Sequence, residues 1–166
     1  MNYSIALDGA STRTDAHQKK SDHIMLMSSG STAVPLPKAI DAEQKSYVSA
    51  QGGRVSYYVD PQATGRPLVL IHSINAAPSA FEMKPLFTYY RTTRPVYALD
   101  LPGFGFSERS QRAYSPALYV NTIIEFLDKV VGQAADVIAL SLGCEFAAMA
   151  AQARPDRFRS LALITP

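Results

Sequence analysis

The sequence predicts an α/β fold, and three observations support this prediction. Short apolar runs of strand length alternate with helix-like segments from residue 67 onward. These runs are almost continuously apolar, as in strands that helices cover on both faces. The composition, 47% hydrophobic and 18% charged, supplies enough apolar side chains for a core. We therefore expect a mostly parallel sheet with helices on both faces, joined by right-handed crossovers.

The N-terminal part of the chain has a different character. Residues 1–45 mix Ser, Thr, Gly, Lys and Asp without a clear period, and we expect a flexible polar leader that contains at most a short strand at 24–27. The folded domain is then 46–166. It opens with KSYVSA and RVSYYVD, two strand-like segments that QGG separates, and this pattern predicts a hairpin.

Strands and helices alternate after the hairpin. Buried strands are predicted at 67–73, 95–100, 136–140 and 160–165. The helix between the first two strands starts at Ser79, with Glu82 three residues later in a capping box, and Pro85 is expected to kink or split it.

Two further helices follow, each with its own boundary signals. Ser115 is a favourable N-cap, Pro116 occupies the first helical position, and Gly132 can end this helix. An alanine-rich helix at 143–153 stops before Pro155.

Composition excludes several classes of partner and site. The net charge is +2, and the largest basic cluster, Lys19 and Lys20, is too small for a nucleic-acid surface. No segment is apolar for long enough to span a bilayer, and no secretory signal is evident. The single cysteine, Cys144, cannot form an internal disulfide and fits a reducing compartment. We expect a cytoplasmic protein without a metal or other cofactor.

Ser141 is the strongest candidate for chemistry. It follows the strand DVIAL directly and precedes the alanine-rich helix without an intervening loop. This arrangement places the serine at the carboxyl edge of the sheet, beside a helix N-terminus that favours negative charge. Gly143 and Cys144 are small enough for the tight turn, and ALSLG is a variant of the G-x-S-x-G nucleophile elbow. The alternative is a serine in a purely structural turn.

Four segments together resemble a known family. VLIHS is similar to a strand and His-Gly motif, ALDLPGFGFSER to D-x-P-G-x-G-x-S, IALSLG to the nucleophile elbow, and RPDRFRSLALITP to the return into the next strand. In this order they resemble the first two thirds of an α/β-hydrolase core, serine-nucleophile branch. The resemblance implies an α/β-hydrolase fold that is incomplete at the C-terminus, without the lid and the last strands.

The resemblance also implies roles for individual residues. Ser141 would be the nucleophile, and the backbone N–H groups of Leu142 and Ile74 would form the oxyanion hole. His72 precedes Ser141, which is the wrong chain order for the general base, and we expect it to be a structural, hydrogen-bonded histidine. Ser73 replaces the glycine of the His-Gly motif and changes the loop HSINAAPS. The residues expected around the pocket are His72, Ser73, Asn75 and Gly143.

The identity of the nucleophile narrows the reaction. Haloalkane dehalogenases and epoxide hydrolases of this superfamily carry aspartate at the elbow, whereas serine favours acyl transfer. We therefore predict a serine hydrolase of the esterase type that acts on a small carboxylic ester or related acyl substrate without a cofactor. A cofactor-free haloperoxidase, which also uses a serine triad, stays an alternative.

The partners of a catalytic serine are missing from the sequence after it. In this family the acid and the histidine follow the nucleophile, but residues 142–166 contain no histidine, and their only acids are Glu145 and Asp156. We expect this chain to be inactive alone, with SLALIT as an exposed edge strand. A complementing C-terminal fragment is one expected partner. A non-catalytic half-domain that acts as a binding module is the alternative function.

Overall fold

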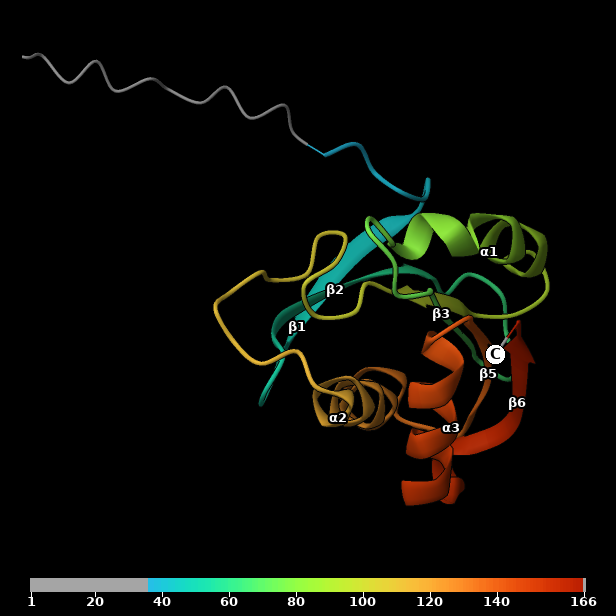
Figure 1. Ribbon diagram of the computed structural model, residues 1–166. Helices are drawn as coiled ribbons and strands as arrows, with labels where there is room; N and C mark the ends of the chain where they lie inside the picture. The colour runs from blue at the N-terminus through green and yellow to red at the C-terminus, as the bar shows by residue number, and fades with distance from the viewer. Residues whose placement is uncertain (1–35, 166) are drawn as a thin grey trace, which may run out of the picture. The chain divides into compact units, whose positions relative to one another are not determined.

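A six-stranded mixed sheet in the order β1-β2-β4-β3-β5-β6 organises the residues that the computed structural model describes, 36–165 (Figure 1). The strands are β1 (Glu43–Ser49), β2 (Gly53–Asp60), β3 (Leu68–Ile71), β4 (Val96–Leu99), β5 (Ala135–Leu140) and β6 (Phe158–Ile164). The β1–β2 and β2–β4 pairs are antiparallel, whereas β4, β3, β5 and β6 run parallel to one another. The predicted fold class is confirmed, and so are the hairpin and the four apolar runs as strands, with slightly different bounds. The prediction that the fourth run is buried is wrong, because β6 is an edge strand within residues 36–165 and none of its residues is buried.

Helices cover both faces of this sheet. They are α1 (Lys84–Tyr90), which follows the 3-10 turn η1 (Ala80–Met83), α2 (Pro116–Phe126), which continues into the π-helical turn η2 (Leu127–Val131), and α3 (Gly143–Ala153), which precedes the 3-10 turn η3 (Pro155–Arg157). Figure 1 shows α1 on one face of the sheet and α2 and α3 on the other. No helix among residues 36–165 is both long and apolar enough to cross a membrane.

The two layers explain why the central strands are continuously apolar. In β3, Val69 and Ile71 point into the cluster beneath α2 and α3, while Leu68 and Leu70 point into the cluster beneath α1. All four side chains are at most 1% exposed. Successive residues of a strand face opposite sides, so a strand covered on both faces cannot carry a polar position without burying it.

The folded region starts earlier than the sequence suggested. Ile40 is buried and packs in the cluster that contains Tyr58, and the Ala39 N–H donates to the Tyr58 hydroxyl at 3.0 Å. The predicted boundary at 45 therefore falls inside ordered structure. The remaining part of the predicted leader, 1–35, with its possible strand at 24–27, lies outside the described residues.

Most helix boundaries follow the predicted signals, with one correction. The Ser115 hydroxyl accepts the Leu118 N–H at 3.3 Å at the start of α2, and Pro85 lies at the start of α1, where the 3-10 turn changes to α-helix. Ser79 caps η1 as expected. The predicted capping box is wrong, however, because the Glu82 carboxylate bonds to the loop after β3 instead of the Ser79 backbone.

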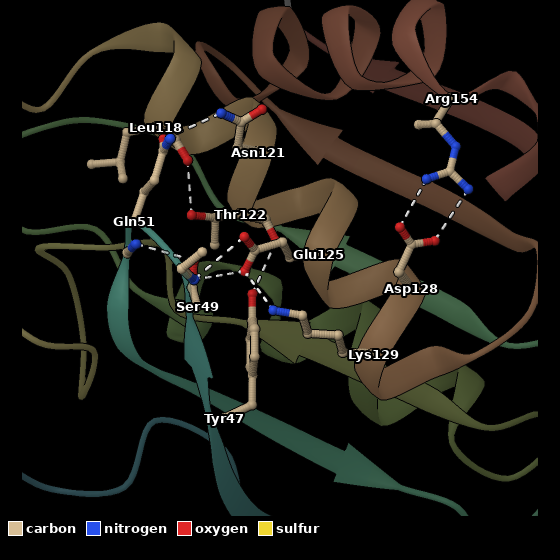
Figure 2. Close-up of polar contacts among 12 residues, drawn as sticks. Tyr47, Ser49, Gln51, Leu118, Asn121, Thr122, Glu125, Asp128, Lys129 and Arg154 are labelled. Carbon is tan, nitrogen blue, oxygen red and sulfur yellow. Dashed lines mark hydrogen bonds and ion pairs between the residues drawn. The ribbon is translucent and has the colours of Figure 1, made fainter.

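A carboxylate on α2 fastens the β1–β2 hairpin to the helical layer (Figure 2). Both Glu125 carboxylate oxygens accept the Ala50 N–H, at 3.0 and 3.3 Å, and Lys129 donates to one of them at 3.3 Å. The Tyr47 hydroxyl donates to the Thr122 carbonyl at 3.0 Å. Burial alone would raise the pKa of Glu125, but these donors hold its pKa below the ordinary value.

We predict that Glu125→Gln lowers the free energy of unfolding by about 1 kcal/mol at pH 7, because the turn N–H loses a charged acceptor. The folded-state pKa of Glu125 is depressed, so its stabilisation is present above the unfolded pKa of about 4.3 and is lost as the pH falls through the folded pKa. Urea denaturation of wild type and variant between pH 3 and 7 measures this difference.

Lys129→Met is the matched control. It removes only the exposed ion pair with Glu125 and is expected to cost less than about 0.5 kcal/mol. A difference between wild type and Glu125→Gln that stays constant below pH 4 would contradict the assignment.

Candidate active site

Ser141 occupies a strained turn between β5 and α3. Its φ is 51°, in the left-handed region that non-glycine residues rarely adopt. This conformation costs about 1–2 kcal/mol and persists only where the surroundings fix it. Here the Ser141 N–H donates to the Ile164 carbonyl at 2.9 Å, and the Cys144 N–H donates to the Ser141 carbonyl at 2.8 Å. The turn therefore presents the serine, which is partly exposed, at the carboxyl edge of the sheet.

Gly143 brings this turn into direct contact with the loop after β3. A Cβ atom at position 143 would lie 2.5 Å from the His72 carbonyl oxygen, a backbone atom that no side-chain rotation can move away. Glycine is required here by space, since its φ is not in the left-handed region. The structure thus joins three of the residues that the sequence analysis singled out: Ser141, Gly143 and His72.

The two predicted oxyanion donors flank this contact. Leu142 precedes Gly143 at the start of α3, and Ile74 follows His72 by two residues. Within residues 36–165, neither the Leu142 N–H nor the Ile74 N–H donates to a protein acceptor. The Ile74 side chain is half-buried against the core beneath α2 and α3, which anchors its backbone. Both N–H groups are therefore available to a ligand.

His72 is fully buried, and both of its ring nitrogens have partners. The Leu101 N–H donates to Nε2 at 2.9 Å, so Nε2 carries no proton. Nδ1 therefore carries the proton and donates to the Ser73 carbonyl at 2.6 Å. Burial lowers the pKa of His72 and keeps the ring neutral. Because its lone pair is already used, His72 cannot take a proton from Ser141 in this arrangement.

Asp100 is a second buried titratable group, and it fixes the loop after β4. Its carboxylate accepts the Ala80 N–H at 2.8 Å and the Phe106 N–H at 3.0 Å, and its carbonyl accepts the Ser107 hydroxyl at 2.6 Å. Burial raises the pKa of Asp100, while the two backbone donors oppose that shift. Asp100 therefore ties the LPGFGFS loop to η1.

Sequence reasoning missed the carboxylate that holds the loop after β3. Glu82 accepts the Ser73 N–H at 2.9 Å, the Ser73 hydroxyl at 2.7 Å and the Asn75 side-chain amide at 2.8 Å. The Asn75 amide also donates to the Ser73 hydroxyl oxygen at 2.7 Å, and its carbonyl oxygen accepts the Ala77 N–H. The spacing of Glu82 from Ser79 matched a capping box, so the sequence carried a competing explanation for the same residue.

A cavity of about 280 Å³ lies between the loops that follow β3 and β4. Its walls include residues 76–79 from the first loop, 103–106 from the second, and the exposed side chain of Arg109. Ser141 and the four residues predicted around the pocket are not part of its lining.

No second histidine accompanies Ser141 in the part of the chain that the structure describes, because His17 and His23 precede residue 36. Glu145 is exposed on α3, one turn from the elbow, and Asp156 forms an ion pair with Arg154. The described residues thus bring the turn that carries Ser141 and Leu142 into contact with the loop that carries Ile74, and they offer Ser141 no histidine with a free ring nitrogen.

We predict that His72 stays neutral, with its proton on Nδ1, from pH 5.5 to 8. The folded-state pKa is lowered, so the unfolded chain binds a proton first, and stability falls by up to about 1.4 kcal/mol per pH unit below pH 6.5. Imidazole ¹⁵N chemical shifts measure the tautomer and the titration. A ring that titrates near pH 6.5 would refute the burial argument.

Comparison with known proteins extends these observations. A sequence profile of the alpha/beta hydrolase family matches residues 68–166. The chain is 35% identical over 104 residues to a 2-hydroxymuconate semialdehyde hydrolase from Pseudomonas putida, and this match covers 62% of the chain and 37% of that protein.

Solved structures agree on the fold. An epoxide hydrolase from an endophytic Streptomyces superposes with a TM-score of 0.61 and 23% identity over 74% of this chain and 36% of its own. A serine hydrolase involved in carbazole degradation superposes with a TM-score of 0.60 and 17% identity over 73% of this chain and 47% of its own. The chain therefore spans less than half the length of these relatives. The profile match runs from β3 through the Ser141 turn to β6, and on this basis the chain belongs to the alpha/beta hydrolase family.

Proposed function

We propose that this protein is a serine hydrolase of the esterase type that acts on a small carboxylic ester or related acyl substrate without a cofactor. The observation that carries the proposal is the strained Ser141 turn, with the unbonded N–H groups of Leu142 and Ile74 beside it. Energetically costly backbone of this kind is typical of functional sites.

In the proposed reaction, the Ser141 hydroxyl oxygen attacks the carbonyl carbon of the substrate. The serine proton goes to a general base, and the carbonyl oxygen becomes an oxyanion that accepts hydrogen bonds from Leu142 and Ile74. One such donor is worth about 3–4 kcal/mol of transition-state stabilisation in well-studied enzymes. The alkoxide then leaves with the proton, and water hydrolyses the acyl-enzyme.

The general base and its orienting acid are proposed to come from outside residues 36–165. Chain order in this superfamily puts both after the nucleophile, and residues 142–166 supply no histidine. We therefore expect residues 1–166 alone to be inactive.

The related proteins support hydrolysis as the reaction class. One is named as a semialdehyde hydrolase, one as an epoxide hydrolase and one as a serine hydrolase. Serine rather than aspartate at position 141 favours acyl transfer over epoxide opening. A cytoplasmic location is part of the proposal and rests on the single free thiol of Cys144.

We predict that a 4-nitrophenyl phosphonate ester labels Ser141 in the native polypeptide, meaning the protein as its source cells make it together with any complementing fragment, and that Ser141→Ala abolishes the labelling. The serine oxygen forms a bond to phosphorus, the phosphorus–aryloxide bond breaks, and 4-nitrophenolate leaves. Intact mass and absorbance at 400 nm measure both products.

Ser110→Ala, in an exposed loop, is the control and should label at the wild-type rate. Undiminished labelling of Ser141→Ala would exclude Ser141 as the nucleophile. A native polypeptide that never labels would refute the proposed function.

An exposed strand edge favours a role in binding as a second candidate. Within residues 36–165, β6 pairs only with β5, and Leu163 and Ile164 are 41% and 39% exposed. An apolar edge of this kind tends to pair with another strand, and we propose that a complementing polypeptide covers it.

We predict that light scattering of residues 1–166 finds associated chains, and that Leu163→Lys shifts the population toward monomer. A stable wild-type monomer would argue against dependence on edge pairing.

A further inference from the structure

The Glu82 side chain bonds to the residues on both sides of Ile74. It accepts the N–H and the hydroxyl of Ser73, which precedes Ile74, and the amide of Asn75, which follows it. Ser73 is only 5% exposed, Glu82 is half-buried and Asn75 is exposed, so this anchor reaches from the surface into the protein. The backbone around Ile74 is therefore held at two points by one carboxylate.

The peptide between Ser73 and Ile74 is fixed in orientation as well as in position. Its carbonyl accepts the His72 Nδ1 proton at 2.6 Å. Because the peptide group is planar and trans, the Ile74 N–H of the same peptide must point away from that carbonyl. The Ser73 N–H donates to the Glu82 carboxylate. Of the Ser73 and Ile74 N–H groups, only that of Ile74 is therefore without an acceptor within residues 36–165.

The Ser73 and Asn75 groups that donate to Glu82 favour an ionised carboxylate. Burial alone would raise the pKa of Glu82, but the hydrogen bonds from Ser73 and Asn75 hold its pKa below the ordinary value. A neutral amide at this position would present its own N–H groups to those donors and lose at least one bond.

We propose that Glu82 is a positioning residue for acyl transfer, which holds Ser73 and Asn75 so that the Ile74 N–H points at the substrate oxyanion. The inference rests on the proposed function. Glu82 touches neither the substrate nor the nucleophile and acts through the loop alone. A negative charge near an oxyanion would by itself slow the reaction, so removing the Glu82 charge should speed labelling if Glu82 acts only through its charge and slow labelling if it positions the loop.

The test uses the 4-nitrophenyl phosphonate ester on the native polypeptide. Phosphonylation develops negative charge on the phosphoryl oxygen, so it depends on the oxyanion donors as acyl transfer does. For Glu82→Gln we expect the limiting labelling rate to fall about tenfold to a hundredfold. This fall is smaller than the fall in rate seen when an oxyanion donor is removed outright. The probe concentration at half-maximal rate should change less than about twofold, because misplaced donors weaken the transition state more than ground-state binding.

A spectroscopic measurement separates positioning from general damage. In the phosphonylated wild type, the Ile74 amide proton should shift downfield as it bonds to the phosphoryl oxygen, and this shift should be lost in Glu82→Gln. Glu145→Gln, an identical change at an exposed site one turn from Ser141, is the control and should leave rate and shift unchanged. Asn75→Ala, which removes one link in an exposed part of the loop, should lower the rate by a smaller factor and stands in if Glu82→Gln does not fold.

The outcomes distinguish this inference from the proposed function. Suppose that the wild type labels and that Glu82→Gln labels at least as fast, with the Ile74 shift intact. The positioning role is then refuted while the serine hydrolase proposal stands. Asn75→Ala is judged in the same way if it replaces Glu82→Gln. If wild type never labels, both fail.

Discussion

The contact between Gly143 and the His72 carbonyl is the constraint on which the site depends. β3 and β5 are parallel neighbours, so their carboxyl ends lie at the same sheet edge. If residue 143 carried a side chain, that side chain would keep the two loops apart. With glycine at 143, the start of α3 meets the His72 backbone directly, and this contact joins the turn that carries Leu142 to the loop that carries Ile74. In the proposed reaction both donors would be backbone groups of sheet-anchored turns, so they would need no reorganisation when charge develops.

Three buried or half-buried titratable side chains serve this geometry without taking part in proton transfer. His72 accepts a backbone N–H from the loop after β4, Asp100 accepts one from η1, and Glu82 accepts one from the loop after β3. A buried backbone N–H left without an acceptor costs about 1–3 kcal/mol, so each of these groups stabilises the loop that it contacts. Burial lowers the pKa of His72 and raises that of Asp100, whereas the pKa of Glu82, which burial alone would raise, is held below its ordinary value by hydrogen bonds. Shifted pKa values more often draw attention to catalytic groups, but here all three belong to groups that hold loops in place.

Local signals in the sequence were sufficient for some of these features and insufficient for others. Continuous apolar runs predicted the buried strands, and the turn after DVIAL predicted the position of Ser141, because both depend on neighbours in sequence. The strand order and the role of Glu82 depend on contacts between distant residues, such as the pairing of β2 with β4. Ile40 was assigned to the leader because its burial against Tyr58 leaves no periodic pattern around it. Glu82 was misread for a different reason: a carboxylate three residues after a serine has two possible backbone partners, and only the fold selects one.

The interactions that hold Ser141 in its strained conformation also fix the direction of the Leu142 N–H, the proposed oxyanion donor. A left-handed serine would relax to an ordinary conformation if its turn were free, at a gain of about 1–2 kcal/mol. The bonds from Ser141 to Ile164 and from Cys144 to Ser141 prevent this, and the Gly143 contact blocks the motion that would accompany it. The same three interactions fix the Leu142 N–H relative to the serine oxygen. Relaxing the turn would therefore displace the Leu142 N–H, so in the proposed mechanism a strain-free turn would no longer aim that N–H at the oxyanion.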